Sequence, residues 1–269
     1  MRRRWPLGLA ALLGVLLLGS MLVAVFKGVR VKGSVPGKGA ILGLAAIGDG
    51  LVIGTADGVL TSADGSTWIV VDGFSGESLA ASAGADVFVL SSGNLYRSSD
   101  LENFTESVPD LGGVTALTAG SEGTVYAARP AEVLTIPPGG PPSPRGFDRG
   151  PPEILALAVG EGASTGMLAG DLSSGLWQSE DSGFTWSRIL ETPIRAVLLD
   201  RAEPGRRFIG TAGGVLWSTV TQPWQFTDLR VPVEALAQTP DGYLAITGDR
   251  LLFESADGLT WKVRSPETD

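Results

Sequence analysis

The side chains of this sequence that could take part in chemistry are carboxylates, hydroxyls, phenols and cations, because its 269 residues include no Cys and no His. This composition excludes disulfides, thiolate nucleophiles, His-containing triads and imidazole acid–base catalysis, and it removes the usual ligands of zinc and haem. We therefore predict no metal site and no cofactor. The groups that remain for catalysis are carboxylates, hydroxyls, Tyr, Lys and Arg, and a pair of carboxylates is the arrangement that many glycosidases use.

Charge is distributed unevenly along the chain. The basic residues before position 39 lie in a stretch without any acid, and they are Arg2, Arg3, Arg4, Lys27, Arg30, Lys32 and Lys38. Removing these seven from the 20 Lys and Arg of the chain leaves 13 against 29 Asp and Glu, a net charge of −16. A domain of this charge repels phosphate backbones, so we predict that it does not bind nucleic acid.

Residues Trp5 to Phe26 form an uncharged, Leu-rich run of 22 residues. A helix of this length, at about 1.5 Å rise per residue, would cross the roughly 30 Å core of a bilayer. We predict an uncleaved membrane anchor over residues 1–27 and a short basic linker over 28–39. A cleaved signal peptide is the alternative, although its apolar region is usually shorter. The leading arginines favour a cytoplasmic amino terminus, which predicts a single-pass cell-membrane protein with its bulk on the extracytoplasmic side.

The chain beyond Lys27 consists of short β-rich runs separated by Gly, Pro, Asp or Ser, which predicts many short strands at even spacing. Five segments align on a Ser that is followed six or seven residues later by an aromatic residue. The five Ser residues are separated by 36, 81, 39 and 37 positions, and the spacing of 81 contains a degenerate copy centred on Val114–Ile136. Six units of this length match the four-stranded blades of a β-propeller.

The most complete copy, Ser179–Trp186, reads Ser-x-Asp-x-Gly-x-Thr-Trp. This motif resembles the Asp box of BNR-repeat proteins, which share the sialidase-like propeller fold. The resemblance implies a turn between the third and fourth strands of a blade, in which Ser and Asp accept backbone N–H bonds and an aromatic ring packs alongside. It gives the aligned residues a structural role, and they are Ser62, Asp64, Trp68, Ser98, Asp100, Phe104, Ser179, Asp181, Gly183, Trp186, Ser218, Trp224, Ser255, Asp257 and Trp261.

We therefore predict an all-β fold, a six-bladed β-propeller of four-stranded blades over residues 40–269, preceded by one N-terminal transmembrane helix. A Pro/Gly-rich insertion at 137–152 replaces the motif of the third blade, and we predict that no strand ladder runs through it. This segment is either a projecting arm that docks on a partner or a lengthened loop. Residues 28–38 either add an outer strand or act as a basic stalk.

The chain also resembles bacterial propellers related to photosystem II assembly factors and sortilin-like ectodomains, which hold protein partners. The resemblance implies a binding face built from the loops between second and third strands, where Asp57, Asp171, Asp249 and Arg250 lie. Trp217 interrupts a row of polar, outward-facing positions and is a further candidate contact. All of these are also ordinary turn or covered residues. The predicted function is a protein-binding scaffold or assembly factor whose partner is another membrane or envelope protein.

Catalysis is the alternative hypothesis. Sialidases carry a Phe/Tyr-Arg-Ile-Pro segment, three arginines and a Tyr–Glu nucleophile pair, and this sequence has no such segment. We expect no enzyme activity, and we keep an exported glycan-binding propeller or a carboxylate-dependent glycoside hydrolase as the second hypothesis. Carboxylates about 5–10 Å apart in a deep pocket with aromatic rings would favour it, whereas a shallow or plugged channel would favour the scaffold.

Overall fold

The computed structural model describes residues 31–32, 34–120, 122–160 and 166–264. The predicted anchor over residues 1–27 lies outside these ranges, as does part of the basic linker. Within the described ranges, no helix is long and apolar enough to span a bilayer.

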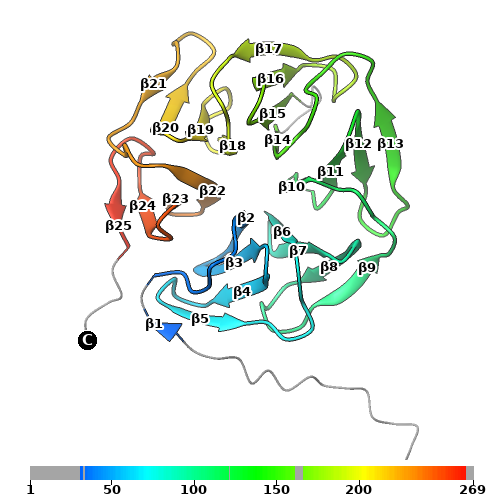
Figure 1. The fold of residues 1–269 in the computed structure, drawn as a ribbon, viewed down its shortest axis with the longest axis vertical. Coiled ribbons are helices and arrows are strands. Elements are labelled where there is room, and N and C mark those ends of the chain that lie inside the picture. The colour runs from blue at the N-terminus through cyan, green and yellow to red at the C-terminus, as the bar shows by residue number, and fades with distance from the viewer. Residues whose placement is uncertain (1–30, 33, 121, 161–165, 265–269) are drawn as a thin grey trace, which may run out of the picture.

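Six antiparallel sheets surround a common axis and form a β-propeller, as predicted (Figure 1). The strands of each blade are given from the axis outward. Blade 1 consists of β2 (Ile41–Ile47), β3 (Gly50–Thr55), β4 (Gly58–Ser62) and β5 (Thr67–Val70), and blade 2 of β6 (Ser78–Ala83), β7 (Asp86–Ser91), β8 (Asn94–Ser98) and β9 (Thr105–Val108). Blade 3 consists of β10 (Ala116–Ala119), β11 (Val125–Arg129), β12 (Glu132–Ile136) and β13 (Ser143–Gly146). Blade 4 consists of β14 (Ala156–Val159), β15 (Met167–Asp171), β16 (Gly175–Ser179) and β17 (Ser187–Leu190), and blade 5 of β18 (Ala196–Leu199), β19 (Arg207–Thr211), β20 (Gly214–Ser218) and β21 (Gln225–Phe226). Blade 6 consists of β22 (Val233–Thr239), β23 (Gly242–Thr247), β24 (Leu252–Ser255) and β25 (Lys262–Val263).

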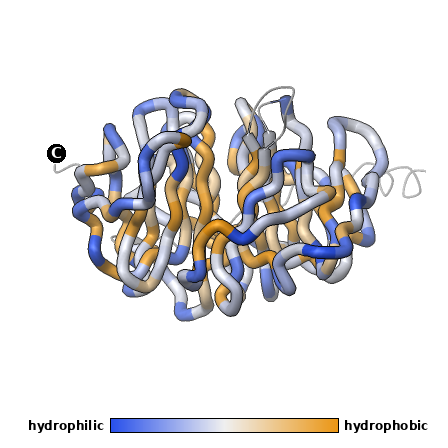
Figure 2. Tube along the Cα trace, turned by 90° about the horizontal axis from the view of Figure 1, so that it is seen from above, coloured by the Kyte–Doolittle hydropathy of each residue, from blue (hydrophilic) through white to orange (hydrophobic). Residues whose placement is uncertain are grey.

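This connectivity gives the ring two faces. The turns between second and third strands and the connections between blades lie on one face, which we call the top face. The other turns, including those with the Ser–x–Asp sequence, lie on the opposite, lower face. Hydrophobic residues follow the strands between the two faces, and hydrophilic residues gather at the turns (Figure 2).

The core lies between the blades. The described buried residues form six clusters, and each cluster combines side chains from two neighbouring blades. Small residues near the axis let the blades approach closely: a Cβ atom at Gly54 would lie 2.1 Å from the carbonyl oxygen of Ser78 in the next blade. A side chain at this position would therefore force the two blades apart.

The turns that contain Ser and Asp join third and fourth strands, as predicted. In blade 4, Ser179 Oγ accepts the Gly183 N–H at 2.8 Å, and Asp181 accepts the backbone N–H of Thr185 at 2.8 Å. Equivalent bonds form around Asp64, Asp100 and Asp257. Blade 5 has no Asp at this position, and there the hydroxyl of Ser218 donates to backbone carbonyl groups instead.

Each blade draws its four strands from one continuous stretch of the chain, so closure of the ring needs no strand from the opposite terminus. The segment before the propeller does add an outer strand: β1 (Val31–Lys32) pairs with β5 of blade 1. Val35, which follows it, is 2% exposed and packs between blades 1 and 6.

The prediction that no ladder runs through the Pro/Gly-rich segment of blade 3 is wrong. Strand β13 pairs with β12 over four residues, with Pro144 opposite Leu134. Proline fits here because β13 is the outermost strand of its blade and needs to pair on one side alone. Arg145 then donates to the Ser182 carbonyl group of blade 4 at 2.8 Å, and its guanidinium lies over the Phe184 ring. The segment is part of the blade and not a projecting arm.

Candidate binding face

Four of the five predicted binding residues lie in turns of the top face. Asp57 lies between β3 and β4, Asp171 ends β15, and Asp249 and Arg250 lie between β23 and β24. Trp217 does not lie with them. It precedes Ser218 at the lower end of β20, and its half-buried ring lies 5.9 Å from the guanidinium of Arg206.

Asp171 is 1% exposed, and its carboxylate is occupied by its own turn. It accepts the backbone N–H groups and the hydroxyl groups of Ser173 and Ser174. Burial acts to raise the pKa of Asp171, but these hydrogen bonds outweigh it and hold the pKa below its usual value. The arrangement is an Asx turn that orders the tip of blade 4.

Asp57 and Arg250 hold the segment that enters the propeller. Asp57 accepts the Gly39 N–H at 2.9 Å, while the guanidinium of Arg250 donates to the carbonyl oxygens of Val35, Pro36 and Gly39. The neighbouring Asp249 accepts the hydroxyl of Thr247 and is otherwise exposed. Asp57 and Arg250 thus occupy the junction of blades 1 and 6, and their part in partner binding stays a prediction.

The innermost strands enclose a central channel with a cavity volume of about 120 Å³. Its lining is mostly Ala and Leu, and Glu234 is the single carboxylate among the described residues that line it. Glu234 forms an ion pair of 2.8 Å with Arg195 near the top mouth. No aromatic side chain is among the described lining residues.

Arg201 closes the lower end of the channel. It follows β18 of blade 5, and its Nη2 donates to the carbonyl oxygens of Ser82 in blade 2 and Ala119 in blade 3, each at 3.0 Å. The side chain therefore crosses the axis from one side of the ring to the other. The channel is a short recess that opens to the top face.

Beside this recess, the top face carries an open groove of about 660 Å³, which we call the top groove. Its walls are three successive connections: from blade 1 to blade 2 at residues 75–77, from blade 2 to blade 3 at 112–115, and from blade 3 to blade 4 at 153–155. The turn at Ser92 and Gly93 completes the walls. Leu42 and Leu155 line both the groove and the channel, so the two spaces are continuous. Sequence reasoning missed this groove, although the glycines in its connections were a visible signal.

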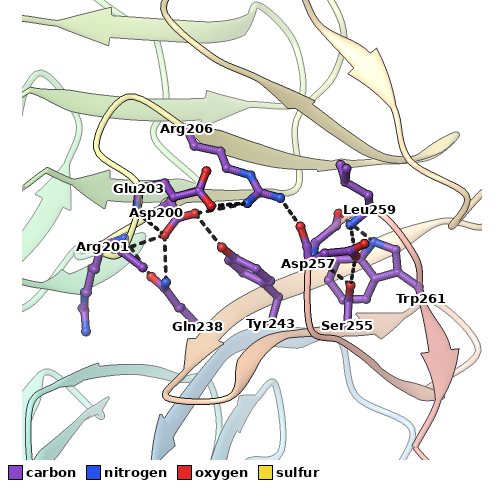
Figure 3. A network of polar contacts seen from close by, with 12 residues as sticks. Asp200, Arg201, Glu203, Arg206, Gln238, Tyr243, Ser255, Asp257, Leu259 and Trp261 are labelled. Atoms are coloured by element: carbon purple, nitrogen blue, oxygen red, sulfur yellow. Dashed lines mark hydrogen bonds and ion pairs between the residues drawn. The ribbon is translucent and has the colours of Figure 1, made fainter.

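A polar cluster on the lower face was also not predicted from the sequence, because no motif marks it. The Asp200 side chain is 0% exposed and accepts hydrogen bonds from Tyr243 Oη at 2.5 Å and Gln238 Nε2 at 2.9 Å (Figure 3). Burial, together with the Asp200 carboxylate, raises the pKa of Tyr243 above its usual value. Arg206 lies 3.9 Å from Asp200 and donates to the Asp257 carbonyl group, so the cluster joins blades 5 and 6.

Within the described part of the chain, no group of three or more Asp and Glu side chains is placed to hold a metal ion. The acidic turn tips of the top face instead bond to their own loops or to the entering segment.

No protein-family model and no curated protein matches the chain. Solved propellers resemble it in fold. YCF48 from Cyanidioschyzon merolae shares 15% identity with a TM-score of 0.54, over 87% of this chain and 88% of that one. A structure of YCF48 bound to D1 peptide shares 16% identity with a TM-score of 0.51, over 88% and 84%. A GH74 enzyme from Niastella koreensis shares 16% identity with a TM-score of 0.56, over 84% of this chain and 37% of that one. At these identities the likeness is one of fold.

Proposed function

We propose that this chain is a protein-binding propeller, a scaffold or assembly factor that its N-terminal segment anchors to the cell membrane with the blades on the extracytoplasmic side. The observation that carries the proposal is the difference between the two ends of the channel, one closed and one open. Arg201 plugs the channel from below, while the top face is open and includes a groove of a size that suits a binding site.

Binding is favoured over glycoside cleavage because a carboxylate mechanism needs two acids that face one substrate. Glu234 is the single carboxylate of the described channel lining, and it forms an ion pair with Arg195 instead of facing a second acid. The Ser–Asp turns bond to their own loops on the lower face, which agrees with the structural role that Asp boxes have in BNR propellers. A propeller of similar fold, YCF48, has been solved with a bound D1 peptide, and this supports a peptide-binding role for the ring.

Purification of the full-length chain from its native membrane, after chemical cross-linking, tests the proposal. We expect a membrane or envelope protein to be recovered in stoichiometric amount, with cross-links to residues of the top face. Protease treatment of sealed cells or spheroplasts should cleave the blades from outside. Recovery of the chain alone, together with glycoside cleavage by the purified chain, would refute the scaffold function.

A further inference from the structure

The top groove has an apolar floor that leads into the channel. Leu79, Leu90 and Leu111 are buried beneath it, while Leu42, Val114 and Leu155 are half-buried and form its surface. The apolar floor lies where the groove meets the recess above Arg201. An aliphatic side chain placed there would remove apolar surface from water, at about 25 cal/mol for each Å² buried.

The walls of the groove expose peptide backbone. A Cβ atom added at Gly76, Gly112 or Gly113 would meet nothing within 4 Å, so these backbones face open space. Gly76 and Gly113 have positive φ values of 77° and 76°, whereas Gly112 does not. Backbone that no side chain shields can form hydrogen bonds with the main chain of an extended ligand.

The charges in the groove have one sign. Glu77 and Glu153 are exposed, and neither carboxylate has a hydrogen bond or an ion pair with any described residue. No Lys or Arg is among the described residues that line the groove. Two unpaired carboxylates beside an apolar floor favour a ligand that carries both a cation and an aliphatic group.

The groove is held in shape before any ligand arrives. The buried Ser78 hydroxyl bonds to Gly76 and Ser91, the Leu111 N–H donates to the Gly93 carbonyl group, and the Thr115 hydroxyl donates to the Ile154 carbonyl group at 2.6 Å. These bonds tie the first and second connections to blade 2 and join the second connection to the third. A preformed groove spends less free energy on ordering when it binds a flexible chain.

We propose that the top groove binds an extended segment of a partner protein in which a Lys or Arg lies within a few residues of an aliphatic side chain. The cation pairs with Glu77 or Glu153, and the aliphatic side chain packs on Leu42 and Leu155 at the channel mouth. The inference rests on the proposed protein-binding function and specifies both its surface and the chemistry of its partner.

Selection of random ten-residue linear peptides on the full-length chain in detergent micelles tests the inference. We expect the enriched peptides to combine Lys or Arg with Leu, Ile or Val. Synthetic peptides of the enriched sequences should bind at least tenfold more weakly to Gly112→Trp, which fills the groove, and to the double variant Glu77→Lys/Glu153→Lys. Gly112→Ala and the charge-matched Glu106→Lys/Glu122→Lys, whose sites lie outside the groove, should bind within twofold of the native chain.

Enrichment of acidic peptides, undiminished binding to the Gly112→Trp variant, or no enrichment at all would overturn the inference. Unfolding midpoints close to that of the native chain show that each variant is folded. The two proposals fail separately. If cross-linking recovers a partner that binds the Gly112→Trp variant as well as the native chain, the groove is refuted as the binding site and the scaffold function stands. If the chain is recovered alone and has glycosidase activity, the scaffold function itself is refuted.

Discussion

Val35 and Arg250 lie 215 positions apart in the chain and hydrogen-bond to each other twice. The Val35 N–H donates to the Arg250 carbonyl group at 3.2 Å, and Arg250 Nε donates to the Val35 carbonyl group at 3.0 Å. The same guanidinium also reaches the carbonyl oxygens of Pro36 and Gly39. These bonds join the first and last blades where no shared strand does.

Replacing Arg250 by Ala should destabilise the fold by about 2–3 kcal/mol, because three carbonyl groups lose a charged donor. Arg250→Lys should recover less than half of this loss, since an ammonium cannot present the same planar set of donors. Urea unfolding of the full-length chain in detergent measures both. Arg188→Gln, which breaks an exposed ion pair with Glu191, is the control and should cost no more than about 0.5 kcal/mol. Equal effects at the two positions would refute the junction role of Arg250.

The carboxylates of the Ser–Asp turns predict a loss of stability in acid. Backbone and side-chain hydrogen bonds lower the pKa values of Asp64, Asp100 and Asp257, and the backbone N–H and hydroxyl of Thr185 lower that of Asp181 to about 2. The unfolded chain, with Asp pKa values of about 3.9, then binds more protons than the folded one in acid. The stabilisation is complete above about pH 4 and is lost as the pH falls towards 2.

The urea midpoint should therefore decrease steadily between pH 4 and pH 2.5. In Asp64→Asn the midpoint should be lower at pH 6 and should depend less on pH, because the amide cannot ionise. A midpoint that stays constant or rises on acidification would contradict the role of these carboxylates.

The buried tryptophans beside the turns offer a matched comparison. Trp261 Nε1 donates to the Gly258 carbonyl group at 3.1 Å, whereas Trp68 Nε1 is buried without a hydrogen-bond partner among the described residues. Both changes to Phe remove the same atoms, so Trp261→Phe should cost about 1 kcal/mol more than Trp68→Phe. Trp68→Ala should cost about 3–5 kcal/mol, because its ring is 0% exposed. Unfolding midpoints of the two Phe variants measure this difference. A larger loss for Trp68→Phe than for Trp261→Phe would contradict a stabilising role for the hydrogen bond between Trp261 and Gly258.

The repeat period was enough to predict the propeller, the number of blades and the position of the Ser–Asp turns, since these depend on local sequence. Strand β13 was missed because its Pro and Gly residues signal a loop, and its place as an outermost strand is a property of the whole sheet. Arg250 was predicted on the correct face, but its partners lie 211 to 215 positions away and no local pattern connects them. The top groove combines three connections that ring closure alone brings together.

The buried pair Tyr243 and Asp200 predicts a specific cost for removing one hydroxyl group. Tyr243→Phe leaves a fully buried carboxylate without its phenol donor, and we expect a loss of about 1–3 kcal/mol. Tyr126→Phe is the matched control, because the pKa of Tyr126 is also raised by burial but its hydroxyl bonds to no described residue, so its loss should be below about 0.5 kcal/mol. Urea unfolding of the two variants at pH 7 measures the difference.

The same pair predicts a pH dependence in alkali. Because the pKa of Tyr243 is raised in the folded state, its contribution to stability is complete below about pH 10 and decreases above it. The difference in unfolding free energy between the native chain and Tyr243→Phe should therefore narrow above that pH. A gap that widens there, or equal losses for the two tyrosines at pH 7, would show that the Asp200 bond does not hold blades 5 and 6 together.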